Sequence, residues 1–141
     1  MSAKSFRSVP EMFFHRVAET PDHKAFQFPV GEGWEWMTWK ETSNRVSAIA
    51  GGLRSMGIEN EQRCAILAST RIEWILADLG ILCSGGATTT VYPSNTAEEC
   101  AYILTDSASR VVFAEDDNQL AKLKEARDLL PEVFKVILID G

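Results

Sequence analysis

The spacing of apolar residues changes along the chain. Before residue 63, apolar side chains recur three and four residues apart, as on one helix face, most clearly at Val46, Ile49, Ala50, Leu53 and Met56. This pattern predicts helices over about residues 9–19 and 39–56, and strands over residues 25–28 and 34–38. The strands flank a glycine-bearing loop, residues 29–33, and so predict a hairpin.

From residue 63 onward, short apolar and β-branched runs alternate with longer helical segments. The expected strands cover residues 64–67, 87–91, 111–114 and 136–139, and the expected helices cover about residues 71–84, 97–107 and 117–130. Such alternation is typical of right-handed parallel crossovers. The sequence therefore predicts an α/β fold in a single domain over residues 1–141. It has a mostly parallel sheet, flanking helices and a small antiparallel hairpin near the N-terminus.

Four predicted helix starts share a local signature, in which a hydroxyl residue is followed three positions later by glutamate. The pairs are Ser8 with Glu11, Thr38 with Glu41, Thr70 with Glu73, and Thr96 with Glu99. In such a pair the hydroxyl accepts from a free backbone N–H of the first turn, and the carboxylate reaches back to the N–H of the cap residue. The four pairs therefore predict where these helices begin.

Two adjacent glycines, Gly51 and Gly52, lie inside the helix predicted at about 39–56. Glycine costs roughly 1 kcal/mol relative to alanine inside a helix. We therefore expect another backbone to pack closely against the helix at this pair.

The formal net charge is -6, and the charges are unevenly distributed. Residues 1–70 carry eight basic and eight acidic side chains, whereas residues 71–141 carry six basic and twelve acidic ones. Binding to a nucleic-acid backbone needs clustered lysine and arginine, which the acidic second half does not offer. We therefore expect no nucleic-acid partner.

The three cysteines, Cys64, Cys83 and Cys100, are widely spaced and form no CxxC pair. This pattern favours buried, reduced thiols in a cytoplasmic protein over disulfides or a metal site. The N-terminus does not resemble a signal peptide. The longest apolar stretch, residues 72–83, is interrupted by acidic residues and is shorter than the roughly 20 residues that span a bilayer.

The loop after the strand predicted at 87–91 is the main candidate for a ligand-facing segment. Its sequence is Tyr92-Pro93-Ser94-Asn95, and ligands of parallel α/β sheets collect beyond the carboxyl ends of the strands. An ordinary strand-to-helix turn explains the same residues, and both interpretations stay open. The threonines at 88–90 alternate between the faces of a strand, so strand propensity explains them better than a phosphate site.

The sequence contains no G-x-S-x-G, HExxH or GxGxxG motif. Ser84, before two glycines, is interpreted as the end of a helix. We therefore assign no catalytic residue and no metal-binding residue.

Aromatic residues gather in and beside the predicted hairpin, at Phe26, Phe28, Trp34, Trp36 and Trp39. Alternation across a hairpin places some of these rings in the core. A lipid-binding or partner-binding surface is the alternative.

Three passages resemble the N-terminal part of the AMP-forming, adenylate-forming superfamily, which includes the acyl-CoA synthetases. They are residues 37–58, 63–104 and 106–123. Within them, the run Arg71-Ile-Glu-Trp, the pair Tyr92-Pro93 and the passage at 102–107 look most like long-chain fatty-acid CoA ligases.

The resemblance implies a two-step reaction in a longer parent protein. ATP and a fatty acid form an acyl-adenylate with loss of pyrophosphate, assisted by magnesium, and coenzyme A then displaces AMP to give the thioester. The family's phosphate-binding loop, nucleotide-binding aspartate and arginine, and C-terminal lysine all lie beyond the equivalent of Gly141. We therefore expect an N-terminal scaffold segment that is inactive and binds no cofactor alone. Its expected contribution is part of the acyl-chain wall, through Trp74, Tyr92 and Pro93.

A stand-alone α/β binding or interaction module without catalysis is the alternative, because a fold alone does not fix a function. If the chain is a fragment, the strand at 136–139 and the helix at 71–84 leave an unpaired edge and an apolar patch. We therefore expect a homo-oligomer, and we keep peripheral membrane contact as a hypothesis.

Overall fold

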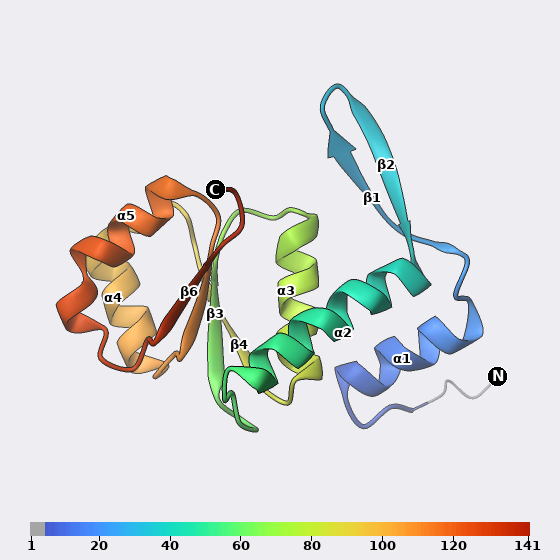
Figure 1. Ribbon diagram of the computed structural model, residues 1–141, viewed down its shortest axis with the longest axis horizontal. Helices are drawn as coiled ribbons and strands as arrows, with labels where there is room; N and C mark the ends of the chain where they lie inside the picture. The colour runs from blue at the N-terminus through green and yellow to red at the C-terminus, as the bar shows by residue number, and fades with distance from the viewer. Residues whose placement is uncertain (1–4) are drawn as a thin grey trace.

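A computed structural model describes residues 5–141 as a four-stranded parallel sheet with helices on both faces and a separate two-stranded antiparallel hairpin (Figure 1). The strands are β1 (Lys24–Val30), β2 (Gly33–Thr38), β3 (Arg63–Leu67), β4 (Ala87–Val91), β5 (Val111–Ala114) and β6 (Lys135–Leu138). The helices are α1 (Val9–Glu19), α2 (Trp39–Ser55), α3 (Ile72–Cys83), α4 (Ala97–Asp106) and α5 (Asp117–Glu125), and a 3-10 turn follows at Arg127–Leu129. The predicted fold class, parallel sheet and N-terminal hairpin are confirmed.

Strand β3 lies in the middle of the sheet, whose order is β4-β3-β5-β6. Its residues alternate between two apolar clusters because successive side chains point to opposite faces. Ile66 belongs to the cluster with Leu53 of α2 and Ile81 of α3, whereas Leu67 belongs to the cluster with Leu104 of α4. Helices α2 and α3 thus cover one face and α4 and α5 the other (Figure 1). The carboxyl ends of all four strands meet at one edge.

Two helix starts have the predicted reciprocal cap. Thr38 Oγ1 accepts from the Glu41 N–H at 3.2 Å, and the Glu41 carboxylate accepts from the Thr38 N–H at 2.8 Å. Thr96 and Glu99 repeat the arrangement at 3.2 and 2.8 Å. The starts of α2 and α4 are therefore fixed by local sequence, as predicted.

Two other starts differ in detail. Ser8 Oγ accepts from the Glu11 N–H at 3.2 Å as predicted, but the Glu11 carboxylate accepts from the backbone N–H of Arg7. Helix α5 has a cap that the sequence analysis missed, because Asp116 accepts from the Gln119 N–H at 3.0 Å.

The predicted cap at Thr70 is wrong. Helix α3 begins at Ile72, and the cap position belongs to Arg71, which makes no side-chain cap hydrogen bond. The reason is electrostatic. The Glu73 carboxylate accepts from the Arg71 guanidinium at 2.6 Å rather than closing a cap with Thr70.

The prediction that another backbone packs closely against Gly51 and Gly52 is also wrong. Both glycines are exposed, and a β-carbon on either would meet nothing within 4 Å. The close approach lies instead at Gly80 of α3, where a β-carbon would be 2.8 Å from Ile49 Cβ of α2. Helices α2 and α3 therefore pack most closely where Gly80 of α3 meets Ile49 of α2.

The hairpin turn is tighter than predicted, because only Gly31 and Glu32 separate β1 from β2. Gly31 has a φ of +57°, which glycine adopts without strain.

The aromatic residues in and beside the hairpin follow the predicted alternation between core and surface only in part. Trp34 and Trp36 are 65% and 47% exposed, whereas Trp39 packs partly buried against the cluster around Phe13.

The C-terminal ends of α5 and α3 compare differently with the prediction. Helix α5 ends at Glu125, before the predicted residue 130. Ser84 closes α3 by donating from its hydroxyl to the Ile81 carbonyl at 2.7 Å, which agrees with its interpretation as a helix end. None of the helices in residues 5–141 meets the length and apolarity needed to cross a membrane.

Candidate functional site

A pocket of about 280 Å³ lies at the carboxyl edge of the parallel sheet. Its walls come from the loop after β3, from the end of β4 and from the first turn of α3. The lining residues are Ala68, Ser69, Thr70, Trp74, Thr90, Val91, Tyr92 and Pro93. The structure therefore brings Trp74, Tyr92 and Pro93, the three residues singled out from the sequence, into one pocket.

The lining combines an aromatic ring with hydroxyl groups. Trp74 is partly buried, and its indole also packs against the apolar cluster between the sheet and helices α2 and α3. Tyr92 is 75% exposed, so its phenol reaches the outer rim. Such a surface can hold an apolar group against the indole and offer hydrogen bonds at its edge.

The loop that carries Tyr92 and Pro93 is held from two sides. Within it, the Asn95 N–H donates to the Tyr92 carbonyl at 3.0 Å and closes a turn before α4. From outside, Lys122 of α5 donates its Nζ to the Pro93 carbonyl. Nothing in the sequence analysis indicated Lys122, because the contact joins residues far apart in the chain.

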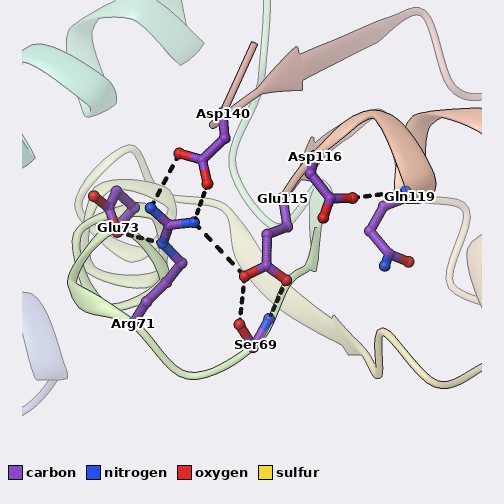
Figure 2. A network of polar contacts seen from close by, with 7 residues as sticks. All are labelled: Ser69, Arg71, Glu73, Glu115, Asp116, Gln119 and Asp140. Atoms are coloured by element: carbon purple, nitrogen blue, oxygen red, sulfur yellow. Dashed lines mark hydrogen bonds and ion pairs between the residues drawn. The ribbon is translucent and has the colours of Figure 1, made fainter. Parts of the chain in front are cut away.

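A network of polar contacts joins the neighbouring loops of the same edge (Figure 2). Arg71, after β3, donates to Glu73 from Nε at 2.6 Å and to Asp140, after β6, from both terminal nitrogens. Its Nη1 lies 3.6 Å from Oε1 of Glu115, after β5. Glu115 in turn accepts from the Ser69 N–H at 3.0 Å and from the Ser69 hydroxyl. One arginine thus connects the ends of three strands.

Arg71 and its carboxylate partners Asp140 and Glu73 stabilise each other's charged forms. Hydrogen bonds to Asp140 and then to Glu73 raise the pKa of Arg71, so the guanidinium stays charged. The hydrogen bond from Arg71 lowers the pKa of Asp140. Desolvation raises the pKa of Glu73, but the hydrogen bond from Arg71 and a backbone hydrogen bond outweigh it, and the net pKa is lowered.

Glu115 and Asp140 were not among the residues predicted from the sequence, although a signal for them was present. Glu115 directly follows β5, and Asp140 lies two residues after the end of β6. The rule that pointed to Tyr92, that ligands and polar groups gather beyond the carboxyl ends of parallel strands, applies equally to them.

A second cavity, of about 460 Å³, opens between α1, the base of the hairpin and α3. Its lining is largely apolar and includes Phe13, Phe26, Trp39 and Leu79. Trp74 lines both this cavity and the pocket at the sheet edge. The indole therefore stands between the two.

The arrangement at the sheet edge is suited to binding and positioning. Within residues 5–141, no group of three or more His, Cys, Asp and Glu side chains is placed to hold a metal ion. The Ser69 hydroxyl donates to the Glu115 carboxylate, which also lies 3.6 Å from the Arg71 guanidinium, so both side chains are held by contacts within the network.

Comparison with known proteins places this geometry in context. Residues 13–141 match the family described as AMP-binding enzyme. Long-chain-fatty-acid–CoA ligase FadD15 of Mycobacterium tuberculosis is 32% identical over 134 residues, which cover 95% of this chain and 22% of that protein. Long-chain-fatty-acid–CoA ligase heimdall of Drosophila melanogaster is 32% identical over 139 residues, which cover 96% of this chain and 20% of that protein.

The fold has a close counterpart among solved structures. The N-terminal domain of FACL13 from Mycobacterium tuberculosis matches with a TM-score of 0.85 and 22% identity, over 95% of this chain and 34% of that one. The chain spans about a fifth of the length of the two curated relatives.

Proposed function

Because the chain belongs to the AMP-binding enzyme family, we propose that it forms the N-terminal scaffold of an ATP-dependent long-chain fatty-acid CoA ligase. The observation that carries the proposal is the 32% identity to two long-chain-fatty-acid–CoA ligases over nearly all of this chain. In the proposed reaction a fatty acid and ATP give an acyl-adenylate and pyrophosphate, and coenzyme A then displaces AMP. Magnesium assists the first step.

In this proposal the pocket at the sheet edge forms part of the wall that holds the fatty acid. Trp74 supplies an apolar face, and the Tyr92-Pro93 turn closes the rim opposite to it. Lys122 supports the site by holding the Pro93 carbonyl. The contribution of these residues is to orient the acid.

The 141-residue chain alone is proposed to be inactive. The resemblance to the adenylate-forming superfamily implies that the groups that hold the triphosphate lie beyond the equivalent of Gly141, and adenylation requires them to be placed against the α-phosphate and the acyl carboxylate. We further propose a cytoplasmic protein that forms a homo-oligomer, with peripheral membrane contact where its fatty acid partitions into lipid.

The test begins with the reading frame that encodes this chain. A frame that continues beyond Gly141 into a Ser/Thr/Gly-rich loop with lysine is expected, and a stop codon there favours a stand-alone module. The complete polypeptide and residues 1–141 are then each incubated with ATP, magnesium and palmitate, and pyrophosphate release is measured. We expect acid-dependent release from the complete polypeptide only. Acyl-AMP formation by residues 1–141 would contradict the proposed division of labour.

A further inference from the structure

Helix α3 carries Trp74 in its first turn, yet its start lacks the local support that the other helices have. Hydroxyl or carboxylate side chains cap α1, α2, α4 and α5, whereas the cap position of α3 is Arg71, without a side-chain cap hydrogen bond. The position of this first turn must therefore be fixed by contacts from elsewhere in the fold.

Those contacts come from the ends of β5 and β6. Arg71 donates to Asp140, 69 residues away in sequence, through both of its terminal nitrogens, and its Nη1 also lies 3.6 Å from Glu115. Ser69 binds Glu115 through its backbone N–H and its hydroxyl. The segment 69–71, which leads into α3, is thus anchored to the chain after β5 and after β6, at the same edge of the sheet.

The anchor is electrostatically sensitive. The Arg71 side chain is 27% exposed and lies among three carboxylates, of which Glu115 is the least exposed at 16%. Removing the guanidinium would leave Glu73, Glu115 and Asp140 without their shared cation, and like charges in a partly buried site repel. The loops would then move apart.

From this geometry we propose that Arg71 is a positioning residue for the fatty acid. It holds the first turn of α3 so that Trp74, three residues further on and on the same side of the helix, faces the Tyr92-Pro93 turn. Arg71 lines a neighbouring cavity with Ser69 and Glu115 but does not line the pocket that contains Trp74, so it acts through the indole. The inference rests on the proposed ligase function.

The fold offers a matched control. Arg110, before β5, pairs with Glu132 at 2.7 Å and lies 5.2 Å from the Phe134 ring centroid. Its side chain is 33% exposed, close to the value for Arg71, but it lies at the amino end of the same sheet. Arg110→Met therefore removes a comparable ion pair without disturbing the pocket.

The experiment compares Arg71→Met, Arg71→Lys, Asp140→Asn and Arg110→Met in the complete ligase, with KM for palmitate, KM for ATP, kcat and melting temperature measured for each. We expect Arg71→Met to raise the KM for palmitate about tenfold or more, because small displacements of a substrate-positioning group are costly. The KM for ATP should change less than twofold. Arg71→Lys keeps the charge but lacks the two-pronged contact, so it should restore the KM only in part, and Asp140→Asn should give an intermediate value.

Arg110→Met should lower the melting temperature without changing the KM for palmitate. The positioning role is overturned if Arg71→Met raises this KM no more than Arg110→Met does, or if it raises both KM values equally. A wild-type polypeptide without acid-dependent pyrophosphate release overturns the ligase proposal and this inference together. An active wild type with an unaffected Arg71→Met variant overturns this inference alone.

Discussion

Gly80 of α3 lies directly against Ile49 of α2. A β-carbon built on Gly80 would be 2.8 Å from Ile49 Cβ and 3.7 Å from the backbone nitrogen of Ala50. The two helices share the same face of the sheet, and α3 carries Trp74. The absence of a side chain at one position therefore sets how closely the helix of the candidate site approaches its neighbour.

Replacing Gly80 by alanine should destabilise the protein. Overpacking a well-packed contact costs about 1–3 kcal/mol, while the gain in helix propensity returns only up to about 1 kcal/mol. Gly52→Ala is the matched control, because its β-carbon meets nothing within 4 Å. We expect it to stabilise α2 by about 0.5–1 kcal/mol. Urea unfolding of both variants measures the difference, and equal effects of the two would refute this account of the packing.

The contrast between these glycines shows where the sequence is informative. Strand and helix order could be predicted because apolar spacing is a local property, readable over ten to fifteen residues. A glycine at a contact between two helices carries the same local signature as one facing solvent. Gly51 and Gly52 were therefore assigned the contact that the structure gives to Gly80.

The helix caps provide a second test. Thr96→Ala removes the acceptor of the Glu99 N–H and should destabilise the protein by about 1 kcal/mol. Thr70→Ala should change the stability by less than about 0.5 kcal/mol, because Thr70 is exposed and does not cap α3. Chemical denaturation is the measurement. A Thr70→Ala variant as unstable as Thr96→Ala would mean that Thr70 caps the helix after all.

The candidate site likewise has a part that the sequence could predict and a part that it could not. Tyr92 and Pro93 were found because they directly follow a strand, which is visible locally. Arg71 was noted only within a family-like run, since its partner Asp140 lies 69 residues away and nothing local joins them. The Tyr92-Pro93 part of the pocket wall was thus predictable from the residue pattern, whereas Trp74 was indicated only by the family resemblance and the contacts that hold the pocket were not predicted.

The cysteines should differ in reactivity. Burial raises the pKa of Cys64 to about 11, and it raises the pKa of Cys83 and of Cys100 as well. Cys64 and Cys100 are fully buried, whereas Cys83 is partly exposed. At pH 8 an alkylating reagent should modify Cys83 first and the other two only in denaturant, because the thiolate is the reactive form. Mass spectrometry identifies the modified site, and rapid labelling of Cys64 in the native protein would contradict its burial.

The edge strand β6 leads to a prediction about association. Within residues 5–141, β6 pairs only with β5, so one row of its backbone groups has no strand partner. Such an edge is a template for pairing with another chain. We expect the apparent mass of this 141-residue chain in light scattering to rise toward a dimer or larger assembly with concentration. A constant monomer mass at high concentration would count against the proposed homo-oligomer.

Because of the contact between Arg71 and Asp140, the free energy of unfolding should decrease as the pH falls. The hydrogen bond from Arg71 holds the folded-state pKa of Asp140 below its ordinary value of 3.8. A carboxylate with a depressed pKa stabilises the fold fully above its unfolded-state pKa, and this stabilisation is lost as the pH falls through the folded-state value. Arg71 stays charged throughout.

The melting temperatures of the wild type and of Asp140→Asn should therefore differ by a constant amount above about pH 5 and converge below the ordinary pKa of 3.8. Adding 1 M salt at pH 7 should also shrink the difference, because Asp140 is solvent-exposed and its charge is screened. Thermal denaturation between pH 3 and pH 8 provides the measurement. A difference that persists or grows on acidification would show that Asp140 contributes by packing, and the ion pair would then not be what holds the end of β6 to α3.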